Sequence, residues 1–137
     1  IPMSISYPPK RGSILRCNFY NFRSPEMTKM RPVIVLSPSF SDRPGLCTIV
    51  ACSSTKPTNI MPYHYEYHIN PVLPSPYDSP IQWIKGDMLY SVSFDRLDFL
   101  FCKKNPNGIR SYDKRVVPND VLHDIEKCVA YGLGIII

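Results

Sequence analysis

The stretch with the clearest chemical potential is residues 23–38, RSPEMTKMRPVIVLSP. A polar loop that contains Glu26, Lys29 and Arg31 leads into Pro32 and then into an apolar run. Because proline restricts the residue before it to extended geometry, we expect Arg31 to be held at the start of a buried strand. A guanidinium held there can bind a phosphate through two parallel hydrogen bonds. On spacing alone, the alternative is that Arg31 pairs with a loop carboxylate such as Glu26.

A second polar cluster follows the apolar run of residues 49–52. The sequence IVACSSTK places Ser53, Ser54, Thr55 and Lys56 directly after that run. Hydroxyls and a lysine at the end of a strand can orient phosphate oxygens. The alternative is an ordinary polar turn.

Residues 63–69 alternate strictly, with His64, Glu66 and His68 on one face of the expected strand and three tyrosines on the other. The polar face has three interpretations: a solvated outer face, a contact with RNA, or a zinc site. We expect no metal site, because no cysteine or fourth ligand has matching spacing. The tyrosines are expected to pack in the core, the alternative being a platform on which bases stack.

The elements that must position these residues are mostly strands, because 15 prolines in 137 residues indicate a loop-rich β protein with few helices. A helix is expected after Pro118, capped by Asn119 or Asp120 and ending at Gly132. We expect five to seven short strands in a small, strongly bent barrel, or an α+β fold with a dominant sheet. The expected strands are residues 13–20, 33–37, 46–52 and 63–69, and residues 89–102 are expected to hold one long strand or two short ones. A turn is expected at 105–108, a surface loop at 70–80 and an apolar tail at 134–137.

Composition is that of one globular domain over residues 1–137, with 44% hydrophobic and 20% charged residues. No apolar run approaches the roughly 20 residues that span a bilayer, so we expect no membrane partner. The net charge of +5 fits a polyanion such as RNA or an acidic protein, although many proteins without such a partner are equally basic. Five cysteines without a CxxC pair indicate free buried thiols in a reducing compartment, and thus a cytoplasmic protein.

The order of these motifs resembles the PemK/MazF family of type II toxin–antitoxin toxins. The family's first strand opens with Gly-[Asp/Ser]-Ile/Leu, and its loop carries a glutamate, four residues, and then Arg-Pro-x-[Val/Ile]-Val-[Leu/Ile]-Ser. Its third strand ends in a hydroxyl pair. After that strand come an Asp with a Ser four residues later, and a closing helix that begins with Pro, then an acidic or amide residue, and a Leu shortly after. The matching segments are residues 12–15, 26–37, 50–54, 87–91 and 118–122, so the resemblance spans about residues 11–132.

The resemblance implies a small SH3-like β-barrel with a C-terminal helix that forms a homodimer. It implies a metal-independent endoribonuclease without a cofactor, which cleaves single-stranded RNA to arrest translation, and a cognate antitoxin whose flexible tail occupies the RNA groove. The family's catalytic arginine falls on Arg31 and its catalytic threonine on Ser53, and Glu26 would be the base or would orient Arg31. Products would carry a 2′,3′-cyclic phosphate and a 5′-hydroxyl. The residues expected to contact RNA are Lys29, Ser54, Thr55, Lys56, His64 and His68.

The chain departs from the family pattern at three places. Ser53 lacks one methyl group of the family's threonine, residues 24–27 differ from the usual sequence around the glutamate, and the proline-rich loop at 70–80 is longer. The cleaved RNA sequence therefore cannot be carried over. Two other functions fit the same fold: a gyrase-directed toxin, and a non-catalytic SH3-like module that binds nucleic acid or protein.

Overall fold

The structure, a computed structural model, describes residues 5–39 and 43–135. Its strands are β1 (Ile14–Cys17), β2 (Arg31–Val35), β3 (Leu46–Ser53), β4 (His64–His68), β5 (Ile81–Ser93), β6 (Leu97–Asp98), β7 (Leu100–Lys104) and β8 (Arg110–Asp113). A short 3₁₀ helix, η1 (Phe94–Arg96), precedes β6, and α1 (Asn119–Gly132) follows β8. The expected mainly β fold with a C-terminal helix is confirmed, but the described chain has eight strands where five to seven were expected.

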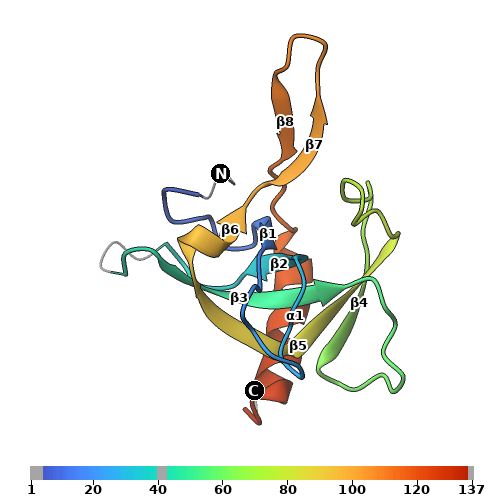
Figure 1. Cartoon of the computed structure of the whole chain (residues 1–137). Coiled ribbons are helices and arrows are strands. Elements are labelled where there is room, and N and C mark those ends of the chain that lie inside the picture. The colour runs from blue at the N-terminus through green and yellow to red at the C-terminus, as the bar shows by residue number, and fades with distance from the viewer. Residues whose placement is uncertain (1–4, 40–42, 136–137) are drawn as a thin grey trace.

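Six strands form one antiparallel sheet in the order β4-β5-β3-β2-β1-β6. The sheet curves strongly, as Figure 1 shows for the long strands β3 and β5. Its edge strands, β4 and β6, do not pair with each other, so the barrel is open. A bulge between Val50 and Ala51 interrupts the β3–β5 ladder, and such a bulge increases the local twist of a sheet.

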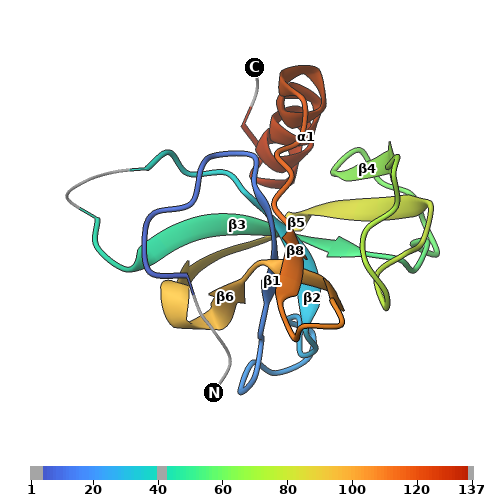
Figure 2. The ribbon, with the colours of Figure 1, turned by 90° about the horizontal axis from the view of Figure 1, so that it is seen from above.

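Strands β2 and β3 are buried on both faces. Val33, Val35 and Ala51 belong to one hydrophobic cluster, while Ile34 and Val50 belong to a second cluster that lies beneath α1. Figure 2 shows α1 on one side of this sheet. Apolar side chains on both faces explain why both strands read as continuous hydrophobic runs in the sequence.

The helix α1 buries Leu122, Ile125 and Val129 as one stripe. The expected cap was wrong: Asn119 is the first helical residue, Pro118 holds the cap position, and no side chain caps the helix. The Pro118 carbonyl instead accepts a hydrogen bond from the Leu122 N–H at 2.9 Å, which starts the helical series. The backbones of α1 and β5 approach each other closely at Gly86 of β5. A Cβ on Gly86 would lie only 2.8 Å from a backbone carbon of Cys128 in α1.

Residues 89–102, expected to hold one long strand or two short ones, contain parts of three strands and a 3₁₀ helix. β5 begins earlier, at Ile81, and η1 and β6 separate it from β7. The turn at 105–108 is present, with Gly108 at a φ of 82° and its N–H bonded to the Asn105 carbonyl, but the strand that follows, β8, was not expected. Residues 70–80 form the expected loop. In the tail, Gly134 and Ile135 are exposed, and residues 136–137 lie outside the described part.

The cysteines follow the prediction only in part. Cys17, Cys47 and Cys52 are buried free thiols, whereas Cys102 is exposed because β7 leaves the body of the protein. Burial raises the pKa of Cys17 to about 12 and that of Cys47 to about 11. No helix in residues 5–39 and 43–135 has the length and apolar character needed to cross a membrane.

Candidate active site

Arg31 and Ser53 meet at one end of the sheet. β2 and β3 are antiparallel, and Val33 pairs with Ala51. The first residue of β2 therefore lies opposite the last residue of β3, with both side chains on the same face. The Arg31 Nη1 donates a hydrogen bond to the Ser53 Oγ at 3.4 Å. Two residues that are 22 positions apart in the sequence thus form one polar pair.

The guanidinium of Arg31 is half-buried and keeps unused donors. Its Nε is buried without a hydrogen-bond partner, and no carboxylate in the described part of the chain forms an ion pair with Arg31. The alternative that Arg31 pairs with Glu26 is therefore not what the structure shows. An arginine whose charge no carboxylate neutralises is suited to bind an anion.

Ser53 is oriented by two donors. It is only 3% exposed, and its Oγ accepts hydrogen bonds from Arg31 Nη1 and from the Thr55 N–H at 3.1 Å. A hydroxyl has two acceptor lone pairs and one O–H donor. Both lone pairs are used, so the O–H hydrogen remains available to donate to a bound group.

The pair lines a pocket of about 370 Å³, which is large enough for a phosphate and part of a nucleotide. The wall is completed by Lys29, Met30, Pro32, Cys52, Ser54, Pro76, Tyr77 and Gln82. Positive and hydroxyl-bearing side chains therefore converge on one hollow, an arrangement that stabilises a negatively charged phosphate or phosphorane.

Tyr77 extends the pocket from the proline-rich loop. Its carbonyl accepts a hydrogen bond from the buried Gln82 Nε2 at 3.0 Å, which fixes the loop to β5. Its hydroxyl lies 3.4 Å from the Met30 carbonyl. Burial raises the pKa of Tyr77, with Arg16 and Arg31 opposing that shift, so the phenol stays protonated at neutral pH and is a hydrogen-bond donor.

The expected RNA-contacting residues near the pair divide into two groups. Lys29 and Ser54 line the pocket. Thr55 donates its backbone N–H to Ser53. Thr55 and Lys56 are exposed and directly follow the pocket residue Ser54 in the sequence. Their contact with RNA stays a prediction.

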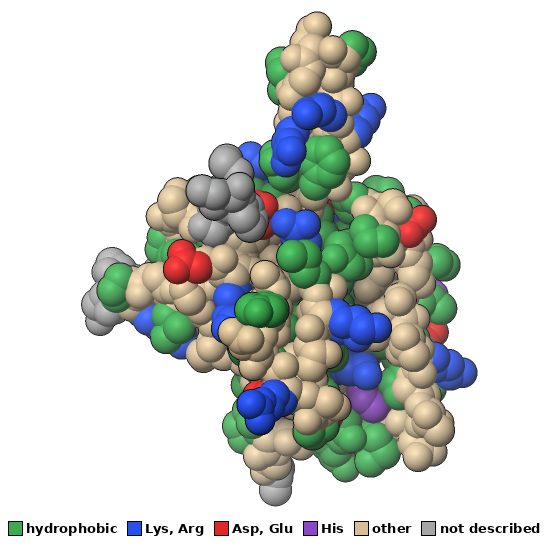
Figure 3. Space-filling view, viewed as in Figure 1, with side chains coloured by type: hydrophobic (Ala, Val, Ile, Leu, Met, Phe, Trp, Pro, Cys, Tyr) green, Lys and Arg blue, Asp and Glu red, His purple; other side chains and the backbone are tan. Residues whose placement is uncertain are grey.

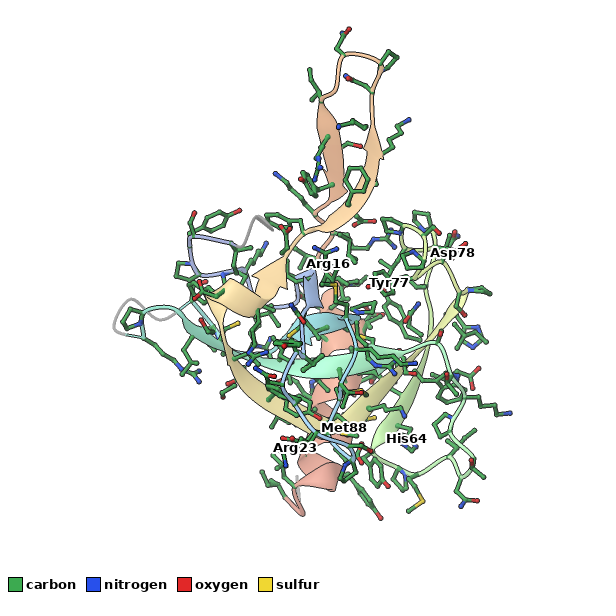
Figure 4. All side chains as sticks on the ribbon, in the orientation of Figure 1. Arg16, Arg23, His64, Tyr77, Asp78 and Met88 are labelled. Atoms are coloured by element: carbon green, nitrogen blue, oxygen red, sulfur yellow. The ribbon has the colours of Figure 1, made fainter. Side chains whose placement is uncertain are left out.

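Glu26 is not brought to Arg31. Its Oε1 accepts a hydrogen bond from the Arg23 N–H at 2.9 Å, within its own exposed loop. Figure 4 places Arg23 at the end of the body opposite Tyr77, a residue of the pocket. The role of Glu26 as a base, or as the group that orients Arg31, therefore stays a prediction without a contact to support it.

His64, Glu66 and His68 make local contacts on β4. The His64 Nδ1 accepts a hydrogen bond from the Met61 N–H at 3.0 Å, and His68 Nε2 lies 2.5 Å from Glu66 Oε2. Burial lowers the pKa of His64, against the opposing effect of Asp87. Figure 4 shows His64 at the other end of the body from Tyr77. Neither histidine lines the pocket, so RNA contact by this face also stays a prediction.

Two tyrosines of β4 pack inward as expected. Tyr65 and Tyr67 are partly buried against the hydrophobic cluster beneath α1. Within residues 5–39 and 43–135, no group of three or more His, Cys, Asp or Glu side chains is arranged to hold a metal ion.

Sequence reasoning missed Tyr77, Pro76 and Gln82 as parts of the pocket. Tyr77 and Pro76 lie in the loop at 70–80, which was expected only as a long surface loop. Gln82 precedes a tryptophan in a strand whose first half was not expected. In the sequence, the only signal was a polar residue, Gln82, next to Trp83 in a run of mostly apolar residues.

Comparison with known proteins agrees with the motifs. A family model described as "PemK-like, MazF-like toxin of type II toxin-antitoxin system" matches residues 10–130. YifN of Escherichia coli K12 is 28% identical over 153 aligned positions, covering 98% of this chain and 97% of YifN.

Solved structures share the fold. Crystalline MazF from Deinococcus radiodurans superposes with a TM-score of 0.61 at 21% identity, covering 94% of this chain and 99% of that one. An endoribonuclease from Mycobacterial species, solved in complex with its cognate antitoxin, gives 0.58 at 17% identity, covering 94% and 98%. The expected MazF-like fold is therefore confirmed, with the open sheet described above.

Proposed function

The chain belongs to the PemK-like, MazF-like toxin family of type II toxin–antitoxin systems, and on that premise we propose that it is a metal-independent endoribonuclease that cleaves single-stranded RNA at the Arg31–Ser53 pocket. The observation that carries the proposal is the Arg31–Ser53 pair itself. It joins a guanidinium without a carboxylate partner among the described residues to a hydroxyl with a free O–H, in one hollow.

The reaction that fits this pocket uses the RNA's own nucleophile. The 2′-oxygen attacks the adjacent phosphorus, the bond from phosphorus to the 5′-oxygen breaks, and the 2′-proton is lost while the leaving oxygen gains one. The products are a 2′,3′-cyclic phosphate and a 5′-hydroxyl. The protein's main task is to stabilise the extra negative charge of the phosphorane.

Arg31 and Ser53 divide that task. Arg31 stays protonated at neutral pH, so it acts by charge and by two parallel hydrogen bonds to the phosphorane oxygens. Ser53 donates its O–H to a nonbridging oxygen, because both of its lone pairs are held by Arg31 and Thr55. These donors are positioned by the folded strands before RNA binds, which is the condition for electrostatic catalysis.

The proposal includes a symmetric homodimer and a cognate antitoxin. A groove of about 300 Å³ between α1 and the sheet is lined by Leu36, Leu89, Val129, Leu133 and Ile135, among others. Leu133 is 57% exposed and Ile135 is 52% exposed, and apolar side chains of this kind support an interface between copies. A solved relative in complex with its cognate antitoxin supports the second partner.

The decisive experiment incubates the protein with a long single-stranded RNA in EDTA and maps the ends of the products. We expect cleavage that leaves cyclic-phosphate and 5′-hydroxyl ends. A preparation of Arg31→Ala, purified in parallel, controls for contaminating nucleases. If the wild-type protein does not cut RNA, or cuts only with a divalent metal, the mechanism is wrong, and a gyrase-directed toxin or a binding module becomes the better interpretation.

A further inference from the structure

The hairpin of β7 and β8, residues 100–113, extends away from the body of the protein (Figure 1). We call this segment the arm. Leu100 is buried at its base, but every residue from 101 to 111 is exposed. With a rise of about 3.3 Å per residue, the five residues of β7 reach roughly 17 Å. Phe101 is 40% exposed and Ile109 is 64% exposed, so the arm presents apolar surface that the rest of the chain does not cover.

Much of the chain's positive charge lies on or beside the arm. Residues 100–115 contain Lys103, Lys104, Arg110, Lys114 and Arg115 against a single acid, Asp113. The Asp113 carboxylate already pairs with Arg115 at 2.7 Å. Figure 3 shows Lys and Arg side chains along the arm with hydrophobic side chains among them. The arm is therefore a cationic surface with little internal neutralisation.

One side of the arm combines cations with aromatic rings. The guanidinium carbon of Arg110 lies 5.4 Å from the centre of the Phe101 ring, and the Phe101 and Tyr112 rings are 5.9 Å apart. Lys104 is the cross-strand partner of Arg110, so both side chains are on this side. Proteins bind single strands by this combination, with bases stacked on aromatic rings and the backbone held by cations.

The arm is continuous with the proposed active site. A hollow of about 180 Å³ at its base is lined by Arg16, Tyr77, Phe101 and their neighbours. Pro76 and Tyr77 line both this hollow and the Arg31–Ser53 pocket. Figure 4 shows Arg16 and Tyr77 together below the arm. The Arg16 Nη2 lies 3.7 Å from the Asp98 Oδ2, and the side chain of Arg16 is 28% exposed.

We propose that the arm binds the single-stranded RNA that flanks the scissile phosphate, along a path from Arg31 past Tyr77 and Arg16 to Phe101 and Arg110. This inference rests on the proposed function, because it assumes that RNA occupies the pocket. RNA fits the arm better than an acidic protein segment does. Carboxylates would use the cations alone, whereas bases also use the exposed ring of Phe101.

The test compares two double variants that each remove two positive charges from exposed positions. Lys104→Ala with Arg110→Ala changes the arm, and Lys10→Ala with Lys127→Ala is the matched control on the body. Cleavage is measured on RNAs of about 15 and about 5 nucleotides, since only the longer one reaches the arm. For the long RNA we expect the arm variant to lose on the order of tenfold in kcat/KM through KM, with kcat unchanged. Both variants should cut the short RNA as the wild type does.

Binding is measured separately, on a 2′-O-methyl RNA of the longer length, which cannot be cleaved because its 2′-oxygen is blocked. The arm variant should flatten the slope of log affinity against log salt by about 1.4, which is 0.7 for each lost phosphate contact. If the arm variant shows this flatter slope but the wild-type protein cuts no RNA, the arm inference holds and the proposed nuclease function fails.

Three results would overturn the inference. One is a loss of RNA affinity and of kcat/KM in the control variant equal to that in the arm variant, which would mean that the effect comes from net charge. Another is an equal loss of affinity for poly-glutamate, which would identify the arm as a site for acidic protein segments. Unchanged binding and kcat/KM in the arm variant would refute it as well.

Discussion

Replacing Arg31 with alanine should separate the chemistry of the pocket from the stability of the fold. Within the described chain, the side chain makes one hydrogen bond, to Ser53 at 3.4 Å, and no ion pair. It belongs to neither hydrophobic cluster. We therefore expect Arg31→Ala to change the free energy of unfolding by only about 1 kcal/mol, the net value of one such bond.

The effect on catalysis should be much larger. Removing one preorganised donor from a developing oxyanion costs about 3–4 kcal/mol, or roughly a hundred- to a thousandfold in rate. Arg31→Lys should also fail, because an ammonium is a point charge and cannot form two parallel hydrogen bonds to a phosphate. A positive charge alone is therefore not sufficient for cleavage, and the two variants should have similarly low cleavage rates.

The assay is single-turnover cleavage of a single-stranded RNA in EDTA, with thermal unfolding of each variant measured in the same buffer. Arg23→Ala is the matched control, since it removes an exposed arginine from the loop that precedes β2. We expect wild-type cleavage from the control. Wild-type cleavage by Arg31→Ala, or a loss in Arg31→Ala explained by a collapsed melting temperature, would refute the assignment of Arg31.

Four further outcomes are expected. Ser53→Ala should lower the cleavage rate by on the order of tenfold, the value of about one hydrogen bond, while Ser53→Thr keeps the hydroxyl and should retain activity. Burial lowers the pKa of His64 below 6.5, so the contribution of His64 to stability should be complete above that pH and should fall as the pH drops toward the folded-state pKa. In His64→Asn, the side-chain oxygen can still accept a hydrogen bond from the Met61 N–H. The melting temperature of this variant should therefore change less than that of the wild type between about pH 7.5 and about pH 5.5. Alkylation followed by mass spectrometry should label Cys102 before Cys17 or Cys52, because those two thiols are buried and their pKa values are raised. Light scattering at micromolar concentration should show a dimer, and Leu133→Asp, which places a charge in the apolar groove, should shift it toward monomer.

The pattern of the sequence was sufficient for the elements that bury apolar residues. Runs of β-branched residues located β2 and β3, strict alternation located β4, and the apolar stripe located α1, although its start was expected one or two residues later than it is. The same patterns placed the proposed catalytic residues, because Arg31 and Ser53 flank two of those buried runs. Their antiparallel pairing then brings the two side chains together.

What could not be predicted depends on how particular loops fold and on contacts between distant segments. Glu26 is five positions from Arg31, yet its loop folds so that the carboxylate binds the Arg23 N–H. Tyr77 reaches the pocket because a buried Gln82 holds its carbonyl, which no periodicity indicates. The arm was predicted only in part. Residues 100–102 fell in an expected strand segment and residues 105–108 in an expected turn, but β8 was missed because its residues are polar and exposed or half-buried and lack the hydrophobic signature of a strand.

The burial of β2 and β3 on both faces has a consequence for how such a protein can diversify. Arg31 and Ser53 are the end residues of the two strands that the surrounding packing fixes most strongly. Tyr77 lies in a loop and packs at the margin of the second cluster, and residues 101–111 of the arm are exposed. If the proposed function holds, changes in length and composition there would alter which RNA is bound without disturbing the pair proposed to cleave it. Reactivity and RNA selectivity would then lie in separate parts of the chain, so that evolution could change the second while it retained the first.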